Sequence, residues 1–147
     1  MNPLNHIHRA LATRTPVIGD TPGSAVAAIL QEGESPQVLF IERAHVKGDP
    51  WSGVIAFPGG RVETSDADLR EAAERETREE IGLDLQPDHY LGRLDDLITQ
   101  TLGIEVAAFV YQIEKTNSLQ LNHEVAAAFW QSFSDLTDPT RQLNHTF

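Results

Sequence analysis

The clearest patterns of apolar and polar positions lie in the first third of the chain. The run from Ser24 to Leu30 is apolar and β-favouring, and the segment from Gln37 to Glu42 alternates between apolar and polar residues. Such patterns predict β-strands, because successive side chains of a strand point to opposite faces of the sheet. The residues between them, Glu32 to Pro36, include turn formers, so we predict that the two strands form a hairpin.

Further apolar runs predict short elements elsewhere. Val54 to Phe57 is strand-like and stops abruptly at Pro58-Gly59-Gly60, a sequence that favours a turn. Tyr90 to Thr99 and Ile104 to Ile113 are two longer strand-like runs around a predicted turn that begins at Gln100. The remaining expected elements are a weak helix over Pro3–Thr13, an apolar run of undecided type over Val125–Phe133, and one helical turn over Ser134–Leu136.

A helical pattern occupies the middle of the chain, from Ser65 to Ile81. Ser65 or Asp66 is a suitable N-cap, and Gly82 stands where a glycine commonly ends a helix. Strands before and after one central helix predict a mixed sheet with helices packed on it. The predicted fold class is therefore α/β or α+β.

Charged residues interrupt the apolar face of this helix. On a helical wheel that advances about 100° per residue, the core-facing stripe lies within about 120° of Leu69 and contains Ala72, Ala73, Thr77 and Ile81. Glu76 and Glu80 lie about 20° on either side of Leu69, and Glu79 flanks them at about 80°. Burying an unpaired carboxylate costs several kcal/mol, so a divalent metal ion bound by these glutamates would explain their position. The alternative is a helix end that overhangs the core and leaves them in solvent.

Composition limits which ions and ligands fit this helix. The chain of 147 residues has the size of one domain and contains no cysteine, so oxygen or imidazole ligands remain and Mg²⁺ or Mn²⁺ fits best. A net charge of -11 opposes unspecific binding to nucleic acid or to an anionic membrane. No apolar run approaches the roughly 20 residues that span a bilayer, and Met1 to Asp20 lacks the apolar centre of a signal peptide. We therefore expect a cytoplasmic protein that binds neither nucleic acid nor membranes.

The pair Gly59-Gly60 lies between a short strand and the acidic helix. Glycines allow the backbone to approach whatever the glutamates hold, and a glycine carbonyl could be a further metal ligand. Pro-Gly-Gly also favours an ordinary turn in any protein. The pair is therefore informative only in combination with the acidic helix.

In combination, these residues resemble the Nudix box, which is a glycine, five residues, a glutamate, seven residues and then Arg-Glu-apolar-x-Glu-Glu-x-Gly-apolar. Residues 75–83, Arg-Glu-Thr-Arg-Glu-Glu-Ile-Gly-Leu, match the second half except that Thr77 occupies an apolar position. Gly60 supplies the first glycine. Asp66 stands where glutamate is usual, and one inserted residue separates Asp66 from Arg75 by eight positions rather than seven.

This insertion and the lead-in from Gly53 to Gly60 resemble the coenzyme A pyrophosphatase branch of the Nudix family. Of the Thr-x-Arg-Ser element of that branch, the segment from Ile41 to Ala44 retains Arg43, and Lys47 takes the later basic place. The chain ends at Phe147, before the closing C-terminal segment that is usual in the branch. On this resemblance, residues 1–22 are an N-terminal helix and lead-in segment, and residues 23–147 are the Nudix hydrolase domain.

The resemblance implies a mixed sheet sandwiched between helices and a metal-dependent hydrolysis of a diphosphate by Mg²⁺ or Mn²⁺. By position in the box, Glu76 and Glu80 would bind metal, and Glu79 would bind metal or accept a proton from the attacking water. Gly60 would supply a carbonyl ligand or hold the loop in shape. Arg75 could orient Glu79 through a charge-assisted hydrogen bond.

Residues outside the box are further candidates for the site. Glu124 matches a recurrent acidic position of the family and is a metal ligand, a catalytic base or a plain loop glutamate. Arg43, Lys47 and Arg61 could contact substrate phosphates, although an exposed basic loop residue is the default interpretation.

The box specifies the bond that is cleaved and not the group attached to it. We expect a small-molecule nucleoside diphosphate substrate, with coenzyme A as the first candidate and ADP-ribose or a nucleotide of the pool as the alternative. A catalytically silent Nudix domain that binds a nucleotide or a protein is the alternative from another class. Whether two chains pair in a homodimer is left open.

Overall fold

The computed structural model describes residues 3–19, 22–33, 35–98, 103–115 and 118–141. Within these residues, eight strands form one mixed sheet with the central order β3-β2-β1-β7-β5, while β4 pairs with β1, β6 with β7 and β8 with β2. The strands are β1 (Ser24–Gln31), β2 (Gln37–Arg43), β3 (Ile55–Ala56), β4 (Gly59–Arg61), β5 (Tyr90–Arg93), β6 (Leu97–Ile98), β7 (Glu105–Ile113) and β8 (Val125–Ser132). The helices are α1 (Pro3–Thr13), α2 (Leu69–Ile81) and α3 (Phe133–Leu136), with 3-10 turns η1 (Pro87–His89) and η2 (Pro139–Arg141).

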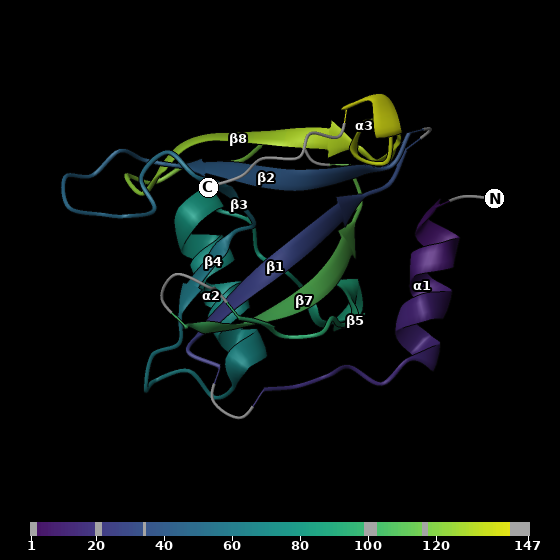
Figure 1. Ribbon diagram of the computed structural model, residues 1–147, viewed down its shortest axis with the longest axis horizontal. Coiled ribbons are helices and arrows are strands. Elements are labelled where there is room, and N and C mark those ends of the chain that lie inside the picture. Colours follow the sequence, from purple (N-terminus) through teal and green to yellow (C-terminus); the bar gives the residue numbers. More distant parts are fainter. Residues whose placement is uncertain (1–2, 20–21, 34, 99–102, 116–117, 142–147) are drawn as a thin grey trace.

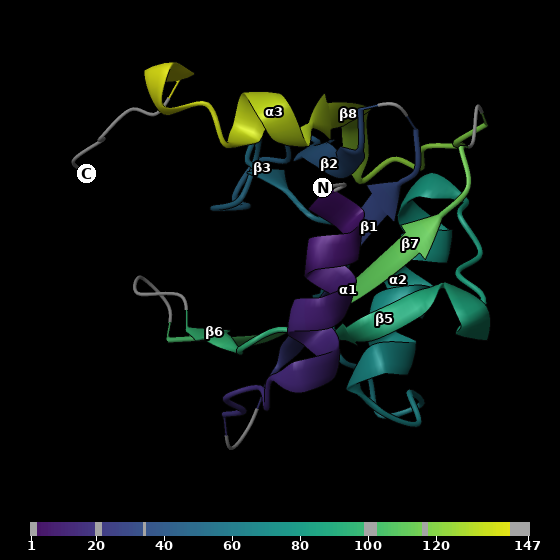
Figure 2. The same ribbon diagram turned by 90° about the vertical axis from the view of Figure 1, so that its right-hand side faces the viewer.

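The helices α1 and α2 cover opposite faces of the sheet at β1 and β7 (Figure 1), and α1 lies in front of these strands when the molecule is turned (Figure 2). On the α2 face, buried alanines of the helix, Ala72 and Ala73, share a core with Ala25 and Ala27 of β1. Small side chains on both elements let the helix lie close to the sheet. The predicted class, a mixed sheet between helices, is confirmed. None of the helices in the described ranges has the length and apolar character needed to cross a membrane.

The predicted hairpin of β1 and β2 is present but short. Its register couples Leu30 with Val38 and Gln31 with Gln37. Along its whole length β1 also pairs in parallel with β7, from Ser24 opposite Val106 onwards. This second pairing places β1 in the middle of the sheet, which explains why its residues are almost all buried.

The helix α2 begins at Leu69, later than predicted. The N-cap is Asp68 rather than Ser65 or Asp66, and its side chain accepts the Glu71 N–H at 2.7 Å. Asp66 instead accepts the N–H of Glu63 at 2.8 Å and faces the helix from the preceding loop. The C-terminus is where the sequence predicts it, because Gly82 has a φ of 70° and donates its N–H to the Arg78 carbonyl.

The alternative interpretation of Gly59-Gly60 as an ordinary turn is wrong. Both glycines belong to β4, which pairs antiparallel with β1, with Gly59 opposite Val26 and Gly60 opposite Ala25. Glycine suits this strand because the neighbouring strand β1 approaches it closely, and a side chain on Gly59 would have no room there.

The strand predicted from Tyr90 to Thr99 is divided into β5 and β6. Between them, Asp95 and Asp96 leave the ladder and accept the N–H groups of Val17 and Gly19, which fastens the segment before β1 to the sheet. Thr99 and most of the predicted turn after it lie outside the described residues. The apolar run of undecided type that begins at Val125 is strand β8.

A polar contact in the core fixes α2 against β7. The hydroxyl of Tyr111, a fully buried residue of β7, donates to Glu74 Oε2 at 2.7 Å. Arg70 Nε donates to the same oxygen at 2.9 Å, and the Arg70 guanidinium lies 3.9 Å from the centre of the Tyr90 ring. This network opposes rotation of the helix about its own axis, and rotation would move the glutamates on its other side.

We expect Tyr111→Phe to lower the free energy of unfolding by about 1 kcal/mol, because it removes one side-chain hydrogen bond without leaving a cavity. Urea unfolding measures the change. Tyr90→Phe is the matched control, since the ring beneath Arg70 is retained and stability should change little. Equal losses in both variants would contradict a specific role for the Tyr111 hydroxyl.

Candidate functional site

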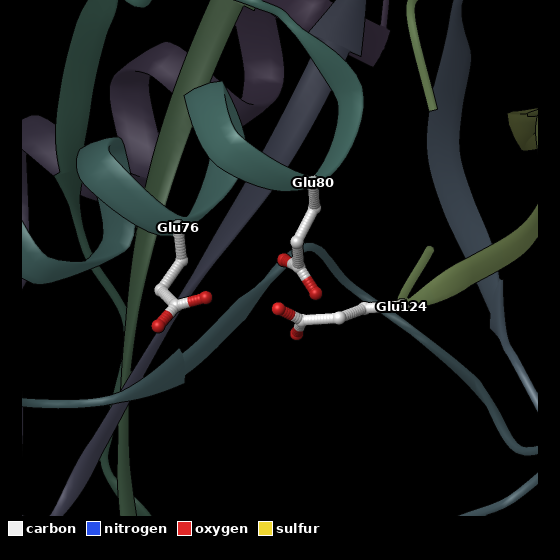
Figure 3. A group of neighbouring side chains, drawn as sticks. All are labelled: Glu76, Glu80 and Glu124. Atoms are coloured by element: carbon white, nitrogen blue, oxygen red, sulfur yellow. The ribbon is translucent and has the colours of Figure 1, made fainter. Parts of the chain in front are cut away.

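Three carboxylates converge where α2 faces the segment that leads into β8 (Figure 3). Glu76 and Glu80 come from one side of α2, and Glu124 comes from the residue immediately before β8. One oxygen of each lies within 4.8 Å of the others. We call these three residues the carboxylate group. The helix therefore does not overhang the core, as the alternative interpretation required.

Glu80 is the most deeply placed member of the group, with no exposed surface. Its Oε1 accepts the Gly59 N–H at 2.8 Å, whereas its Oε2 is buried and has no hydrogen-bond partner among the described residues. The pKa of Glu80 is raised to about 8, mainly by burial; the Gly59 hydrogen bond opposes this shift, and the nearby negative charges of Glu76 and Glu124 add to it. A buried carboxylate oxygen that lacks a donor is a position where a cation would be favourable.

Glu76 lies beside the glycine strand β4. Burial also raises the pKa of the Glu76 carboxyl, and a hydrogen bond of 3.1 Å from Arg75 Nη1 opposes that shift. A Cβ on Gly60 would lie 2.8 Å from Glu76 Cδ. Gly60 therefore makes room for this carboxylate, and alanine at position 60 would force the carboxylate to move.

Arg75 connects the box helix to the loop before it. Its Nε and Nη2 donate to the two oxygens of Asp66 at 2.8 and 3.1 Å, and Nη2 also donates to the Arg61 carbonyl at 3.2 Å. The hydrogen bond from Arg75 lowers the pKa of Asp66, so the pair stays ionised. The aspartate that stands in place of the usual glutamate thus binds the arginine of the box despite the inserted residue.

Glu79 lies outside the carboxylate group. Half of its side chain is exposed, and its Oε2 accepts a hydrogen bond of 3.2 Å from Arg75 Nη1. The same Nη1 donates to Glu76, so Arg75 holds these two carboxylates near one another. The predicted contact between Arg75 and Glu79 is confirmed, but the sequence did not predict that Asp66 and Glu76 share the arginine.

Arg43 is not the exposed loop residue of the default interpretation, because it is the last residue of β2 and is partly buried. Its side chain is 28% exposed, its Nη2 pairs with Asp49 at 3.3 Å, and its buried Nε has no hydrogen-bond partner in the part of the chain that the structure describes. Its charge lowers the pKa of Glu80, in opposition to the dominant effect of burial. Arg43 ends β2 in register with Val125, so its position near Glu124 depends on a pairing of distant strands that the sequence alone does not show. Lys47 and Arg61 are exposed, as the default interpretation predicts.

The carboxylate group fits a hard divalent cation. Carboxylate oxygens are the preferred ligands of Mg²⁺ and Mn²⁺, and three such groups come together with one oxygen left unpaired. Without a cation, burial and mutual repulsion raise the pKa of both Glu76 and Glu80. The arrangement can therefore bind a cation and release protons as it does so.

Comparisons with known proteins extend this description. A family model for the NUDIX domain matches residues 21–146. An uncharacterized protein of Schizosaccharomyces pombe is 37% identical over 115 residues, which cover 73% of this chain and 35% of that protein. The mitochondrial coenzyme A diphosphatase NUDT8 of Homo sapiens is 33% identical over 88 residues, which cover 58% of this chain and 37% of that protein. The chain thus spans much less than the full length of either relative.

Solved structures show the same architecture. The crystal structure of a MutT/nudix family protein from Enterococcus faecalis superimposes with a TM-score of 0.64 at 18% identity, covering 90% of this chain and 51% of that one. At this identity the likeness concerns the fold, and it agrees with the mixed sheet between helices described above.

Proposed function

Because the chain belongs to the Nudix family, we propose that it hydrolyses a phosphoanhydride bond in a small nucleoside diphosphate derivative. One observation carries the proposal: the box helix brings Glu76 and Glu80 to Glu124 and leaves a buried oxygen of Glu80 without a partner. A binding domain without catalysis has no need for three repelling carboxylates at one point, since each lowers stability when it is buried.

In this proposal Glu76, Glu80 and Glu124 hold Mg²⁺ or Mn²⁺. The bound ion would neutralise the diphosphate and lower the pKa of a coordinated water. Gly60 either adds its carbonyl as a ligand or serves the site by its lack of a side chain. The second role is favoured because a Cβ at Gly60 would lie only 2.8 Å from Glu76 Cδ.

Glu79 is assigned the role of base. Its carboxylate is half exposed, so it can meet an incoming water, and Arg75 holds it on the side of Glu76. Glu79 would accept a proton from the water as the water oxygen forms a new P–O bond. The P–O bond to the bridging oxygen breaks, and the leaving phosphate departs with the electron pair. Arg75 acts by positioning, because two of its guanidinium nitrogens, Nε and Nη2, are held by the two oxygens of Asp66.

Coenzyme A is the substrate we propose first. The human relative is named a coenzyme A diphosphatase, and the segment from Gly53 to Gly60 resembles that branch. Arg43, which the branch resemblance singles out, is held by Asp49 close enough to affect Glu80. The positively charged guanidinium of Arg43 can bind a phosphate oxygen of the substrate from this position, which gives Arg43 a physical role.

A hydrolysis screen tests the proposal. Coenzyme A, ADP-ribose, dinucleoside polyphosphates and nucleoside triphosphates are incubated with the protein in Mg²⁺, in Mn²⁺ and in EDTA, and the products are separated. We expect metal-dependent turnover that is greatest for coenzyme A, with release of 4'-phosphopantetheine. Glu79→Gln should lower kcat by about a hundredfold or more, as loss of a general base does.

The outcomes separate the alternatives. Glu114→Gln, a replacement of an exposed glutamate outside the site, is the matched control and should keep full activity. Preference for ADP-ribose or another diphosphate would retain the reaction and reject coenzyme A. Absence of metal-dependent turnover for every compound would reject the reaction and favour a silent binding domain.

A further inference from the structure

A short segment crosses the C-terminal end of α2 and carries Glu124 to the site. The N–H of Gln120 donates to the Ile81 carbonyl at 2.9 Å, and the N–H of Asn122 donates to the Glu80 carbonyl at 3.0 Å. The last carbonyls of a helix have no partner within the helix itself. The segment therefore caps the helix at the residue that provides the buried carboxylate.

Gly82 permits this close crossing. Its φ of 70° is favourable for glycine, and a Cβ at this position would lie 3.2 Å from the Cβ of Gln120. The helix end and the segment are thus in direct contact, so a shift of one is transmitted to the other.

Asn122 links the segment to Glu124 as well. Its side-chain Oδ1 accepts the Glu124 N–H at 2.9 Å, and its carbonyl accepts the Val125 N–H at 3.3 Å. This is a turn in which the side chain closes on the backbone two residues later. One residue is consequently bonded through its main chain to Glu80 and through its side chain to Glu124.

We propose that Asn122 is a positioning residue that sets the spacing of Glu80 and Glu124 and thereby the affinity of the carboxylate group for a divalent cation. This inference rests on the proposed function. The carboxylates repel one another, so the Glu124 backbone must be restrained for its side chain to stay within reach of Glu80 (Figure 3). Residues that orient metal ligands commonly contribute 10- to 100-fold to metal affinity, roughly the range expected here.

The test measures Mn²⁺ affinity on metal-free protein, from the electron paramagnetic resonance signal of free Mn²⁺, together with the unfolding midpoint in EDTA. Asn122→Ala is expected to weaken Mn²⁺ binding about tenfold. Asn122→Gln should weaken it similarly, because the longer amide cannot close the same turn. Asn122→Ser, whose neutral hydroxyl can accept the same N–H, should stay within about threefold of the wild type.

Two controls separate positioning from general damage. His123→Ala alters an exposed neighbour in the same segment and should leave the Mn²⁺ affinity unchanged. If Asn122→Ala and Asn122→Gln lower the unfolding midpoint but bind Mn²⁺ as tightly as the wild type, the positioning role is overturned while the proposed function stands. If the wild type itself binds no Mn²⁺, the proposed function is overturned, and the positioning role is overturned with it.

Discussion

Replacing Glu80 by glutamine is expected to lower kcat/KM about a thousandfold in saturating Mg²⁺ and, at pH 8, to stabilise the metal-free protein. The loss of activity follows because glutamine removes one negative ligand from the carboxylate group that would hold the metal at the scissile diphosphate. The gain in stability follows because a neutral amide can keep the hydrogen bond from Gly59 without the cost of a buried charge.

The sign of the pH dependence follows from the raised pKa. The folded protein binds a proton at Glu80 up to a pKa of about 8, whereas the unfolded chain loses it near the ordinary value of 4.5. Between these values the folded state binds more protons, so the wild type loses stability as pH rises through this window. At pH 8 this effect lowers the free energy of unfolding of the wild type by up to about 4 kcal/mol. The glutamine amide is imperfectly paired, which offsets part of the gain from removing the carboxylate. We therefore expect Glu80→Gln to be about 2 kcal/mol more stable than the wild type at pH 8.

Urea unfolding in EDTA at pH 5 and at pH 8 measures this difference. The two proteins should be closer in stability at pH 5, where Glu80 is protonated in the folded wild type. Glu114→Gln, which removes a charge from an exposed side chain, should show no such pH-dependent difference. A Glu80→Gln variant that is less stable than the wild type at pH 8 would show that the carboxylate is not a burden to the metal-free fold.

The second large effect is expected at Gly59. A Cβ built there lies 2.3 Å from the Ala25 carbonyl oxygen and 2.6 Å from Val26 Cα, and the Gly59 φ of 153° is one that side-chain-bearing residues rarely adopt. Both contacts are with main-chain atoms of β1, which cannot turn aside. We expect Gly59→Ala to cost at least about 3 kcal/mol in the free energy of unfolding.

The same substitution should also disturb the site, because displacement of β4 takes the Gly59 N–H away from Glu80. Soluble yield and the urea midpoint measure the stability, and Gly23→Ala is the matched control. A Cβ at Gly23 meets no atom of the described residues within 4 Å, so this variant should fold as the wild type does. Comparable stability of both variants would mean that β4 can move away from β1 at little cost.

The sequence predicted best what depends on local geometry. Charges at Glu76 and Glu80 within the apolar stripe follow from the helical repeat alone, and the structure places both carboxylates inward. Glu79, at the edge of the stripe, turns instead to Arg75 and solvent. A wheel gives the direction of a side chain's Cβ but not the partner that its end selects.

Contacts between distant segments could not be predicted in this way. Asp66 has the chemistry of an N-cap, yet its pairing with Arg75 depends on how the preceding loop folds back, and Asp68 takes the cap. The meeting of Glu124 with Glu80 depends on the crossing of the helix end by residues 118–124. Family resemblance singled out Glu124, but left open whether it was a ligand, a base or a plain loop residue.

The parallel pairing of β1 with β7 also governs when the site can form. Ser24 of β1 pairs with Val106 of β7, so the middle of the sheet cannot form until β7 has been synthesised. Pairings so distant in sequence slow folding and leave strand edges exposed meanwhile, which favours aggregation. Glu124 emerges later still. A growing chain therefore presents Glu76 and Glu80 before their third partner exists, so the complete carboxylate group can assemble only after residue 124 has been synthesised.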